Sequence, residues 1–320
     1  MRINKDRTAQ EVSQSEIRTI SYDSRKKLIA VGAFEEPVLI YRYPYMKLFK
    51  KITHREKILV EGDELFLDEK SIIEKKGVKF RKGKILSPIK VIFSQTSPYL
   101  IIVYTNGDIL IYNITTWKKQ TELFLPESIT SVQLVKKGKF LYLITSWEIT
   151  IINTQTWKIT KTKKLENIQI QSAILTENSK TIFIISDKKR VRSFNFETLE
   201  EENVFKGHKS GINMIRLSPD EKILATCGND GKISLFNAEN GEFLGFCLGH
   251  NDEVHAIDFS SNGKFLVSSS EDETIRLWDI LTFKCVKIMQ NIPNAFTMKI
   301  YSGLLVMGTV SGDILTFKIY

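Results

Sequence analysis

The amino-acid sequence predicts an all-β protein built from repeated four-stranded units. Two stretches, residues 207–237 and 249–279, align without a gap at a shift of 42 residues. Within each stretch, apolar runs of strand length are separated by polar turns roughly every 8–12 residues, a pattern typical of all-β architecture. Repeats of roughly 20–50 residues indicate units that stack on one another, because a single unit cannot bury its apolar faces alone.

Four positions of the repeat carry matching side chains in both copies. They are His250, Ser268, Asp272 and Trp278 in the second copy, and His208, Thr226, Asp230 and Phe236 in the first. A Gly precedes each of the two His residues, and Asp279 follows Trp278. A period of about 42 residues with Gly-His and Trp-Asp marks is typical of one blade of a β-propeller.

On these residues the sequence resembles the WD-repeat family. The resemblance implies that His250, Ser268, Asp272 and Trp278 form the hydrogen-bonded tetrad of that family, which buries a polar turn with its partners satisfied. In the first copy the same set is His208, Thr226 and Asp230, and Phe236 replaces Trp, so that network lacks one donor. The resemblance further implies a closed ring in which an N-terminal segment supplies the last strand, which removes exposed sheet edges.

The position of Trp278 can be followed through the whole chain. It is occupied by Tyr41, Tyr112, Ile152, Phe194, Phe236 and Phe317, and from Tyr112 onward the spacings are 40, 42, 42, 42 and 39 residues. The 71 residues between Tyr41 and Tyr112 are too many for one unit and too few for two. The intervening segment is therefore either a compressed blade or an insertion, and the sequence predicts seven or eight four-stranded blades.

We predict a single propeller domain over residues 1–320. Its parts are a closing strand at 1–12, a blade at 13–53, the compressed blade or insertion at 54–85, and five further intact blades with a final three-stranded unit at 86–320. The final unit ends after its third strand, which is why the N-terminal segment is expected to complete it.

The positive charge is concentrated in the first two-thirds of the chain. Residues 1–206 hold 36 Lys and Arg against 24 Asp and Glu, whereas residues 207–320 hold 10 against 13. Such an asymmetry favours RNA or an acidic protein surface as a partner. The candidate contact residues are Lys158, Lys161, Lys163, Lys164, Lys188, Lys189 and Arg190. The alternative is that these lysines only form a solvated surface, since the Lys ammonium group cannot make the bidentate contact with a phosphate that the Arg guanidinium makes.

Two sets of aromatic residues lie in predicted turns. We label the four strands of a unit a to d in chain order. Trp147 occupies the position that Gly107 holds in the preceding unit, which is a b–c turn. We therefore expect it on the face that carries the b–c turns and d–a loops, as an anchor for a partner. The alternative is that it covers a neighbouring blade. Trp117, Trp157 and Phe283 share a register in the c–d turns, and this repetition favours a structural role, with each turn packed against its own blade.

No catalytic constellation is visible in the sequence. None of the four His residues has metal-ligand spacing, and three scattered Cys indicate a reduced, cytoplasmic or nuclear protein. We therefore expect no enzyme activity, cofactor, metal, small-molecule substrate or membrane contact. The family resemblance implies a scaffold for other proteins in a eukaryotic multiprotein complex. The alternative is an RNA-associated subunit in ribosome assembly or tRNA modification, because residues 186–250 are loosely similar to the non-catalytic propeller subunit of the tRNA guanine-7 methyltransferase.

Overall fold

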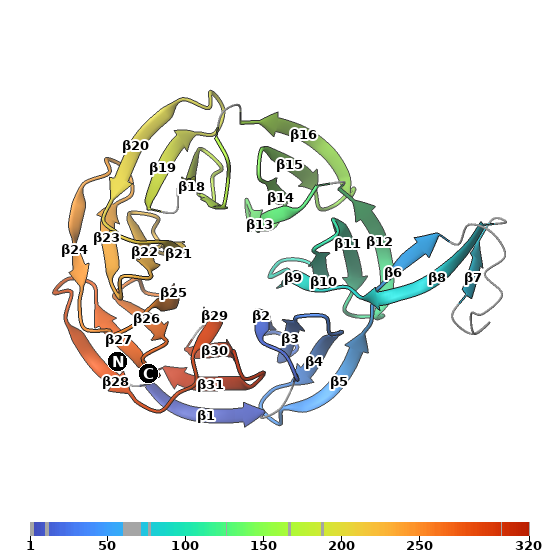
Figure 1. Ribbon diagram of the computed structural model, residues 1–320, viewed down its shortest axis with the longest axis horizontal. Coiled ribbons are helices and arrows are strands. Elements are labelled where there is room, and N and C mark those ends of the chain that lie inside the picture. Colours follow the sequence, from blue (N-terminus) through green and yellow to red (C-terminus); the bar gives the residue numbers. More distant parts are fainter. Residues whose placement is uncertain are drawn as a thin grey trace.

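The computed structural model shows a ring of β-sheets (Figure 1). It describes residues 3–9, 13–59, 72–75, 78–125, 127–165, 168–186, 189–301 and 303–319, with backbone alone for 3–9 and 55–84. The described residues form 31 strands, β1 to β31, and contain no helix. Seven antiparallel sheets of four strands surround a common axis, and we number them blades 1 to 7.

Each blade runs from an inner strand a to an outer strand d. Blade 1 contains β2 (Ile17–Asp23), β3 (Leu28–Ala33), β4 (Val38–Arg42) and β5 (Lys47–Ile52). Blade 2 contains β9 (Pro88–Phe93), β10 (Tyr99–Tyr104), β11 (Asp108–Asn113) and β12 (Lys118–Phe124). Blade 3 contains β13 (Ile129–Val135), β14 (Phe140–Thr145), β15 (Glu148–Asn153) and β16 (Lys158–Lys164). Blade 4 contains β17 (Ser172–Leu175), β18 (Thr181–Ile185), β19 (Arg190–Asn195) and β20 (Glu201–Lys206).

The C-terminal blades follow the same order. Blade 5 contains β21 (Ile212–Leu217), β22 (Ile223–Gly228), β23 (Ile233–Asn237) and β24 (Phe243–Cys247). Blade 6 contains β25 (Val254–Phe259), β26 (Phe265–Ser270), β27 (Ile275–Asp279) and β28 (Cys285–Met289). Blade 7 contains β29 (Ala295–Tyr301), β30 (Leu304–Thr309) and β31 (Ile314–Ile319), and its outer strand is β1 (Ile3–Ala9).

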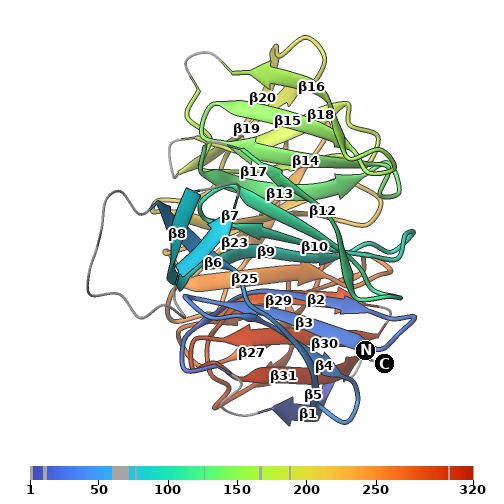
Figure 2. The same cartoon turned by 90° about the vertical axis from the view of Figure 1, so that its right-hand side faces the viewer.

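The N-terminal strand closes the ring, as the sequence predicts. β1 pairs antiparallel with β31, from Ile3 opposite Ile319 to Ala9 opposite Ile314. The backbone N–H of Ser13 then donates to the carbonyl of Gly312 at 3.2 Å. The two ends of the chain therefore lie side by side in both views (Figures 1 and 2). Residues 1–2 and 10–12 of the predicted closing segment lie outside the described residues.

The alternative of eight blades is wrong. The chain between blades 1 and 2 forms a separate three-stranded sheet of β6 (Arg55–Leu59), β8 (Val78–Ile85) and β7 (Ile72–Lys75), which lies outside the ring (Figure 1). Its two ends meet, because Arg55 pairs with Ile85 and the N–H of Leu86 donates to the carbonyl of His54 at 3.0 Å. The segment thus leaves and re-enters the ring at one point, and Figure 2 shows its sheet displaced toward one face.

The hydrophobic core lies between the blades. Successive side chains of a strand point to opposite faces of its sheet. In β10, Leu100 and Ile102 accordingly pack against blade 1, whereas Ile101 and Val103 pack against blade 3. Both faces of the strand are buried, which explains why the sequence YLIIVY (99–104) is continuously apolar instead of alternating.

The aromatic residues of the c–d turns reach the preceding blade in addition to the expected packing on their own blade: Trp157 belongs to one core cluster with Ile152 of blade 3 and Ile101 of blade 2. The Trp117 ring contacts Phe49 of blade 1 at 5.4 Å, and the Trp157 ring contacts Tyr99 of blade 2 at 5.4 Å. Both Trp residues have left-handed backbones, with φ of 55° and 54°. The left-handed conformation directs these rings across the blade boundary, and it costs about 1–2 kcal/mol per non-glycine residue. The ring contacts offset that cost.

Phe283 shows the same arrangement between blades 5 and 6. A Cβ atom on Gly245 of β24 would lie 2.7 Å from the Phe283 ring, so only glycine leaves room for that ring. The aromatic turn residues therefore fasten blades 2, 3 and 6 to the blades before them.

Candidate functional site

The antiparallel strand order sorts the connections of the ring onto two faces. The b–c turns and d–a loops lie on one face, which we call the loop face, and the a–b and c–d turns lie on the other, the turn face. The predicted tetrads and Trp147 belong to the loop face, and so do Lys189, at the end of the b–c turn of blade 4, and Arg190, the first residue of its c strand. Lys188 lies outside the described residues.

The four predicted residues of blade 6 are hydrogen-bonded to one another. The Trp278 Nε1–H donates to Ser268 Oγ at 2.8 Å, and Ser268 Oγ lies 2.7 Å from His250 Nε2. His250 Nδ1 lies 2.8 Å from Asp272 Oδ2, and the imidazole side chain is completely buried. Since the carboxylate only accepts, Nδ1 is the donor of that contact and Nε2 accepts from the serine hydroxyl.

The electrostatics of this network keep His250 neutral and Asp272 ionised. Burial lowers the pKa of His250, and the neighbouring Asp272 opposes the shift only in part. Burial would raise the pKa of Asp272, but hydrogen bonds from Thr274, His250 and the backbone N–H of Asn251 outweigh burial and hold it at about 2. The carboxylate therefore ties the d–a loop to the b–c turn throughout the physiological pH range.

The network of blade 5 differs where Phe236 replaces the tryptophan. His208 Nδ1 lies 2.9 Å from Asp230 Oδ1, and His208 Nε2 lies 2.8 Å from Thr226 Oγ1. A second hydroxyl, that of Ser234, lies 3.2 Å from the same Nε2, and the sequence did not suggest this contact. Phe236 instead contacts the Phe205 ring of blade 4 at 5.5 Å, so it reinforces the blade boundary.

A third His–Asp pair was missed by the sequence reasoning. His54 Nε2 lies 2.7 Å from Asp108 Oδ2 in the b–c turn of blade 2, and the Asn106 amide donates to the same oxygen at 2.7 Å. The insertion separates His54 from the blade that it serves, so a gap-free alignment does not find it. The position of His54 in the sequence could have indicated the pair. His54 comes two residues after Ile52, the last residue of the d strand of blade 1, just as His208 comes two residues after Lys206 at the end of the d strand of blade 4.

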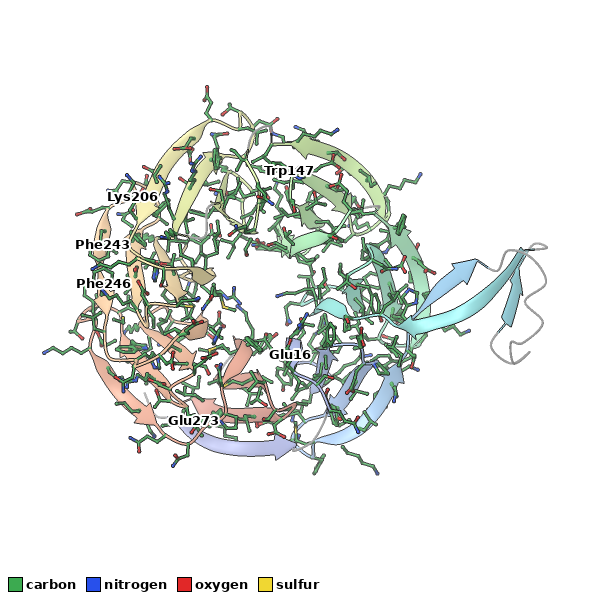
Figure 3. The ribbon with its side chains drawn as sticks, viewed as in Figure 1. Glu16, Trp147, Lys206, Phe243, Phe246 and Glu273 are labelled. Atoms are coloured by element: carbon green, nitrogen blue, oxygen red, sulfur yellow. The ribbon has the colours of Figure 1, made fainter. Side chains whose placement is uncertain are left out.

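Trp147 lies in the tight turn between β14 and β15, and the residue is 49% exposed. Hydrogen bonds to a side chain order the backbone of this turn, because Thr145 Oγ1 accepts from the N–H groups of Trp147 and Glu148 at 3.3 and 3.0 Å. The Trp147 carbonyl accepts from Leu165 N–H of the following loop at 2.9 Å. An exposed aromatic residue is thus held by an ordered backbone, and Figure 3 labels Trp147 on blade 3.

The lysines predicted to contact a partner are not equivalent. Lys158, Lys161 and Lys164 are exposed on β16, the outer strand of blade 3. Lys163 is buried, and its ammonium donates to the carbonyls of Phe196 at 2.5 Å and Glu197 at 2.7 Å. The assignment of Lys163 to a partner surface is therefore wrong: it fastens blade 3 to the c–d turn of blade 4. Lys161 also pairs with Glu197, at 2.9 Å, and this hydrogen bond is the main cause that lowers the Glu197 pKa.

The outer strands of blades 5 and 6 carry an apolar surface that the sequence reasoning also missed. Phe243, Leu244, Val286 and Ile288 are between 37% and 51% exposed on β24 and β28. The rings of Phe243 and Phe246 contact each other in a tilted arrangement with a centroid distance of 4.6 Å, and both residues are labelled in Figure 3. The signal was the segment FLGFC at 243–247, which is apolar at a position where β16 reads KITKTKK.

Two groups in the described residues combine donors that suit a metal ion. They are His54 with Asp108 and Glu122, and His255 with Glu253 and Glu271, and within each group the donor atoms lie within 4.8 Å of one another. Each His already contacts a carboxylate at hydrogen-bond distance, 2.7 Å to Asp108 and 2.9 Å to Glu271. The expected absence of metal, cofactor and enzyme activity stays a prediction.

Comparison with known proteins agrees with this geometry. The family model described as "WD domain, G-beta repeat" matches residues 199–237 and 241–279. Two WD40 repeats lie within the seven-bladed propeller. The resemblance seen in the Gly-His and Trp-Asp marks is thereby confirmed, and the two matches end at Asn237 and Asp279, the last residues of the c strands of blades 5 and 6.

One curated relative of the propeller is the serine-threonine kinase receptor-associated protein of Dictyostelium discoideum. The two sequences are 33% identical over 116 residues, which is 36% of this chain and 39% of the relative. The chain thus matches about two-fifths of that protein.

Among the described residues of the propeller, no helix is long and apolar enough to cross a lipid bilayer.

Proposed function

We propose that this propeller is a non-catalytic platform that binds other proteins through its loop face, within a multiprotein complex. The exposed indole of Trp147 is the observation that carries the proposal. A tryptophan is enriched at the energetic centre of protein interfaces because it buries a large rigid surface at low entropic cost. Its turn is already ordered by Thr145, so binding would not have to order it.

Two further observations support the platform. Phe34 and Val310, each 40% exposed, add apolar side chains to b–c turns of the same face. The name of the Dictyostelium relative describes a protein associated with a kinase receptor, which fits an adaptor role for the shared region. Cytoplasmic or nuclear residence belongs to the same proposal.

An affinity purification with matched variants tests the proposal. Tagged Trp147→Ala and Tyr45→Ala chains are expressed in the native cell, and captured proteins are quantified by mass spectrometry with and without nuclease. Tyr45 is a suitable control because it is an exposed aromatic, at 85%, on the turn face. We expect Trp147→Ala to lose partners that Tyr45→Ala keeps, at an unchanged melting temperature. Equal capture by both variants would contradict the loop-face anchor.

An RNA-associated role is the second candidate, and the exposed lysines of β16 favour it. Lys158, Lys161 and Lys164 lie along one outer strand, where they would read charge and not sequence. The nuclease treatment separates the two candidates: partners that persist after nuclease support the platform, and partners that all disappear support the RNA role.

A further inference from the structure

A hollow on the loop face lies where blade 6 meets blade 7. Its volume is about 420 Å³, and the residues that line it come from three separate connections. Glu271 and Glu273 belong to the b–c turn of blade 6, Asn291, Pro293 and Asn294 to the following d–a loop, and Val310 to the b–c turn of blade 7. Figure 3 labels Glu273, far around the ring from Trp147.

The walls of the hollow are fixed by backbone hydrogen bonds. Ile292 N–H donates to the carbonyl of Glu273 at 3.0 Å, and Val310 N–H donates to the carbonyl of Asn294 at 3.0 Å. The N–H of Glu271 donates to the carbonyl of Glu253 at 3.0 Å and ties this turn to the d–a loop that precedes blade 6. Because the three connections are tied to one another, the hollow exists before any ligand binds.

The charge in the hollow is negative. Glu271 and Glu273 are both exposed, and within the described residues the Glu273 carboxylate has no cationic partner. Glu271 accepts from His255 Nε2 at 2.9 Å, and Glu253 Oε2 lies 3.8 Å from the same nitrogen. Two carboxylates therefore share one imidazole, and the Glu273 carboxylate adds to them, which leaves a surplus of negative charge at the edge of the hollow.

Asn294 provides a second, independent observation. The residue is 8% exposed, and in the described structure the Oδ1 of its side chain has no hydrogen-bond donor. Buried amide oxygens almost always have a partner, so an unpaired one in the lining of a hollow points to a donor that arrives with a ligand. The donor that fits two carboxylates and an amide oxygen is a cation with several N–H groups.

Pro293 and Val310 add an apolar part to the same lining. The side chains of arginine and lysine combine a methylene stem with a cationic head, and they bury the stem on apolar surface while the head contacts acceptors. A metal ion would be bound by the carboxylates, but it would make no use of the apolar side chains of Pro293 and Val310.

We infer that this hollow binds an arginine or lysine side chain of a protein partner. Its stem lies on Pro293 and Val310, and its head reaches Glu271, Glu273 and the Asn294 amide oxygen. The inference rests on the proposed platform function, since it names the kind of partner segment that one part of the loop face accepts. An arginine is expected to bind more tightly than a lysine, because its planar fork engages several acceptors at once.

Peptide selection on the whole purified chain tests the inference directly. Random dodecapeptides are selected on the protein, and the enriched sequences are labelled with fluorescein for anisotropy titrations. We expect one position to be enriched in arginine, and its replacement by norleucine to weaken binding at least tenfold. Affinity should also fall as salt rises, because the contact is between charges.

Variants of the protein assign the binding to the hollow. Glu273→Gln and Asn294→Leu should each weaken the selected peptide at least fivefold, whereas Glu242→Gln, the same charge change on the turn face, should not. Equal affinity for Glu273→Gln and the unchanged chain would overturn the inference, as would peptides without a basic position. Binding that requires added Zn²⁺ would show a metal site at His255 instead and would also overturn it.

Failure of this inference can be told apart from failure of the proposed function. Trp147→Ala should leave peptide affinity unchanged, since Trp147 is on blade 3 and the hollow is on blades 6 and 7. If the peptides bind as expected but no cellular protein is captured, the hollow stands and the platform fails. If proteins are captured through Trp147 and no basic peptide binds, the platform stands and the hollow fails.

Discussion

Replacement of Asp272 by alanine should destabilise the propeller far more than replacement of an exposed aspartate. The Asp272 carboxylate, which is 6% exposed, receives four hydrogen bonds: from His250 Nδ1 at 2.8 Å, Asn251 N–H at 3.1 Å, and the N–H and hydroxyl of Thr274 at 3.0 and 2.7 Å. Alanine removes the acceptor, so the buried His250 Nδ1 keeps only the longer contact with Thr274 Oγ1 at 3.2 Å, and the exposed Asn251 N–H loses its carboxylate partner. The change therefore unties the d–a loop from the b–c turn.

The magnitude follows from the pKa and from the stranded donors. A pKa of about 2 in the folded chain, against 3.8 for a free aspartate, corresponds to about 2 kcal/mol in favour of the ionised folded form. Buried donors left without acceptors add about 1–3 kcal/mol, part of which the first figure already includes. We expect Asp272→Ala to lower the free energy of unfolding by about 2–4 kcal/mol.

The assay is chemical denaturation at pH 7 with Asp252→Ala as the matched control. Asp252 is exposed, two residues beyond His250, and its replacement should cost about 0.5 kcal/mol or less. Because the pKa of Asp272 is depressed, its stabilisation is complete above about pH 4 and is lost as the pH falls toward about 2. The difference between the unchanged chain and Asp272→Ala should narrow over that interval. Equal midpoints for the two alanine variants at pH 7 would refute the tetrad as a stabilising network.

Three further predictions concern other parts of the ring. Deletion of residues 1–12 exposes the edge of β31, so the truncated chain should melt at a lower temperature or aggregate; an unchanged melting temperature would contradict the closure by β1. Burial, together with the nearby charges of Arg216 and Lys299, lowers the pKa of Lys90 to about 8. The protonated amine therefore destabilises the folded chain, and the free energy of unfolding should increase as the pH rises from about 8 toward 10.5. Lys90→Met should remove this rise and stabilise the chain at pH 7 by up to about 3 kcal/mol, and a loss of stability at pH 7 would contradict the argument. Replacement of Lys158, Lys161 and Lys164 by Glu should abolish weak, salt-sensitive RNA binding in filter assays with the fold intact, while unchanged binding would place the contact elsewhere.

The repeat made most of the ring predictable from sequence. The 42-residue shift aligned His250 with His208 and Asp272 with Asp230, and the structure places both pairs at hydrogen-bond distance. Closure by the N-terminal strand followed from the final unit, which has only three strands after β28. These features depend on local spacing, which a sequence displays directly.

Features that depend on contacts between blades could not be predicted in the same way. Residues 55–85 contain short strands like those of a blade, and only their pairing shows a separate three-stranded sheet. Lys163 looks like its neighbours on β16, but the pleat of the strand turns it toward the carbonyls of Phe196 and Glu197. The hollow at blades 6 and 7 combines residues from 271 to 310, and no single segment displays that combination.

The loop face as the surface that binds partners is the central claim. Hydrogen–deuterium exchange of the purified propeller, alone and with a captured partner, tests it most directly, because it reports protection along the whole backbone. The account predicts slower exchange in the b–c turns and d–a loops, above all in residues 144–150 beside Trp147 and in residues 271–273 if the partner carries a basic segment. Protection confined to the a–b and c–d turns, with the loop face exchanging as in the free protein, would contradict it.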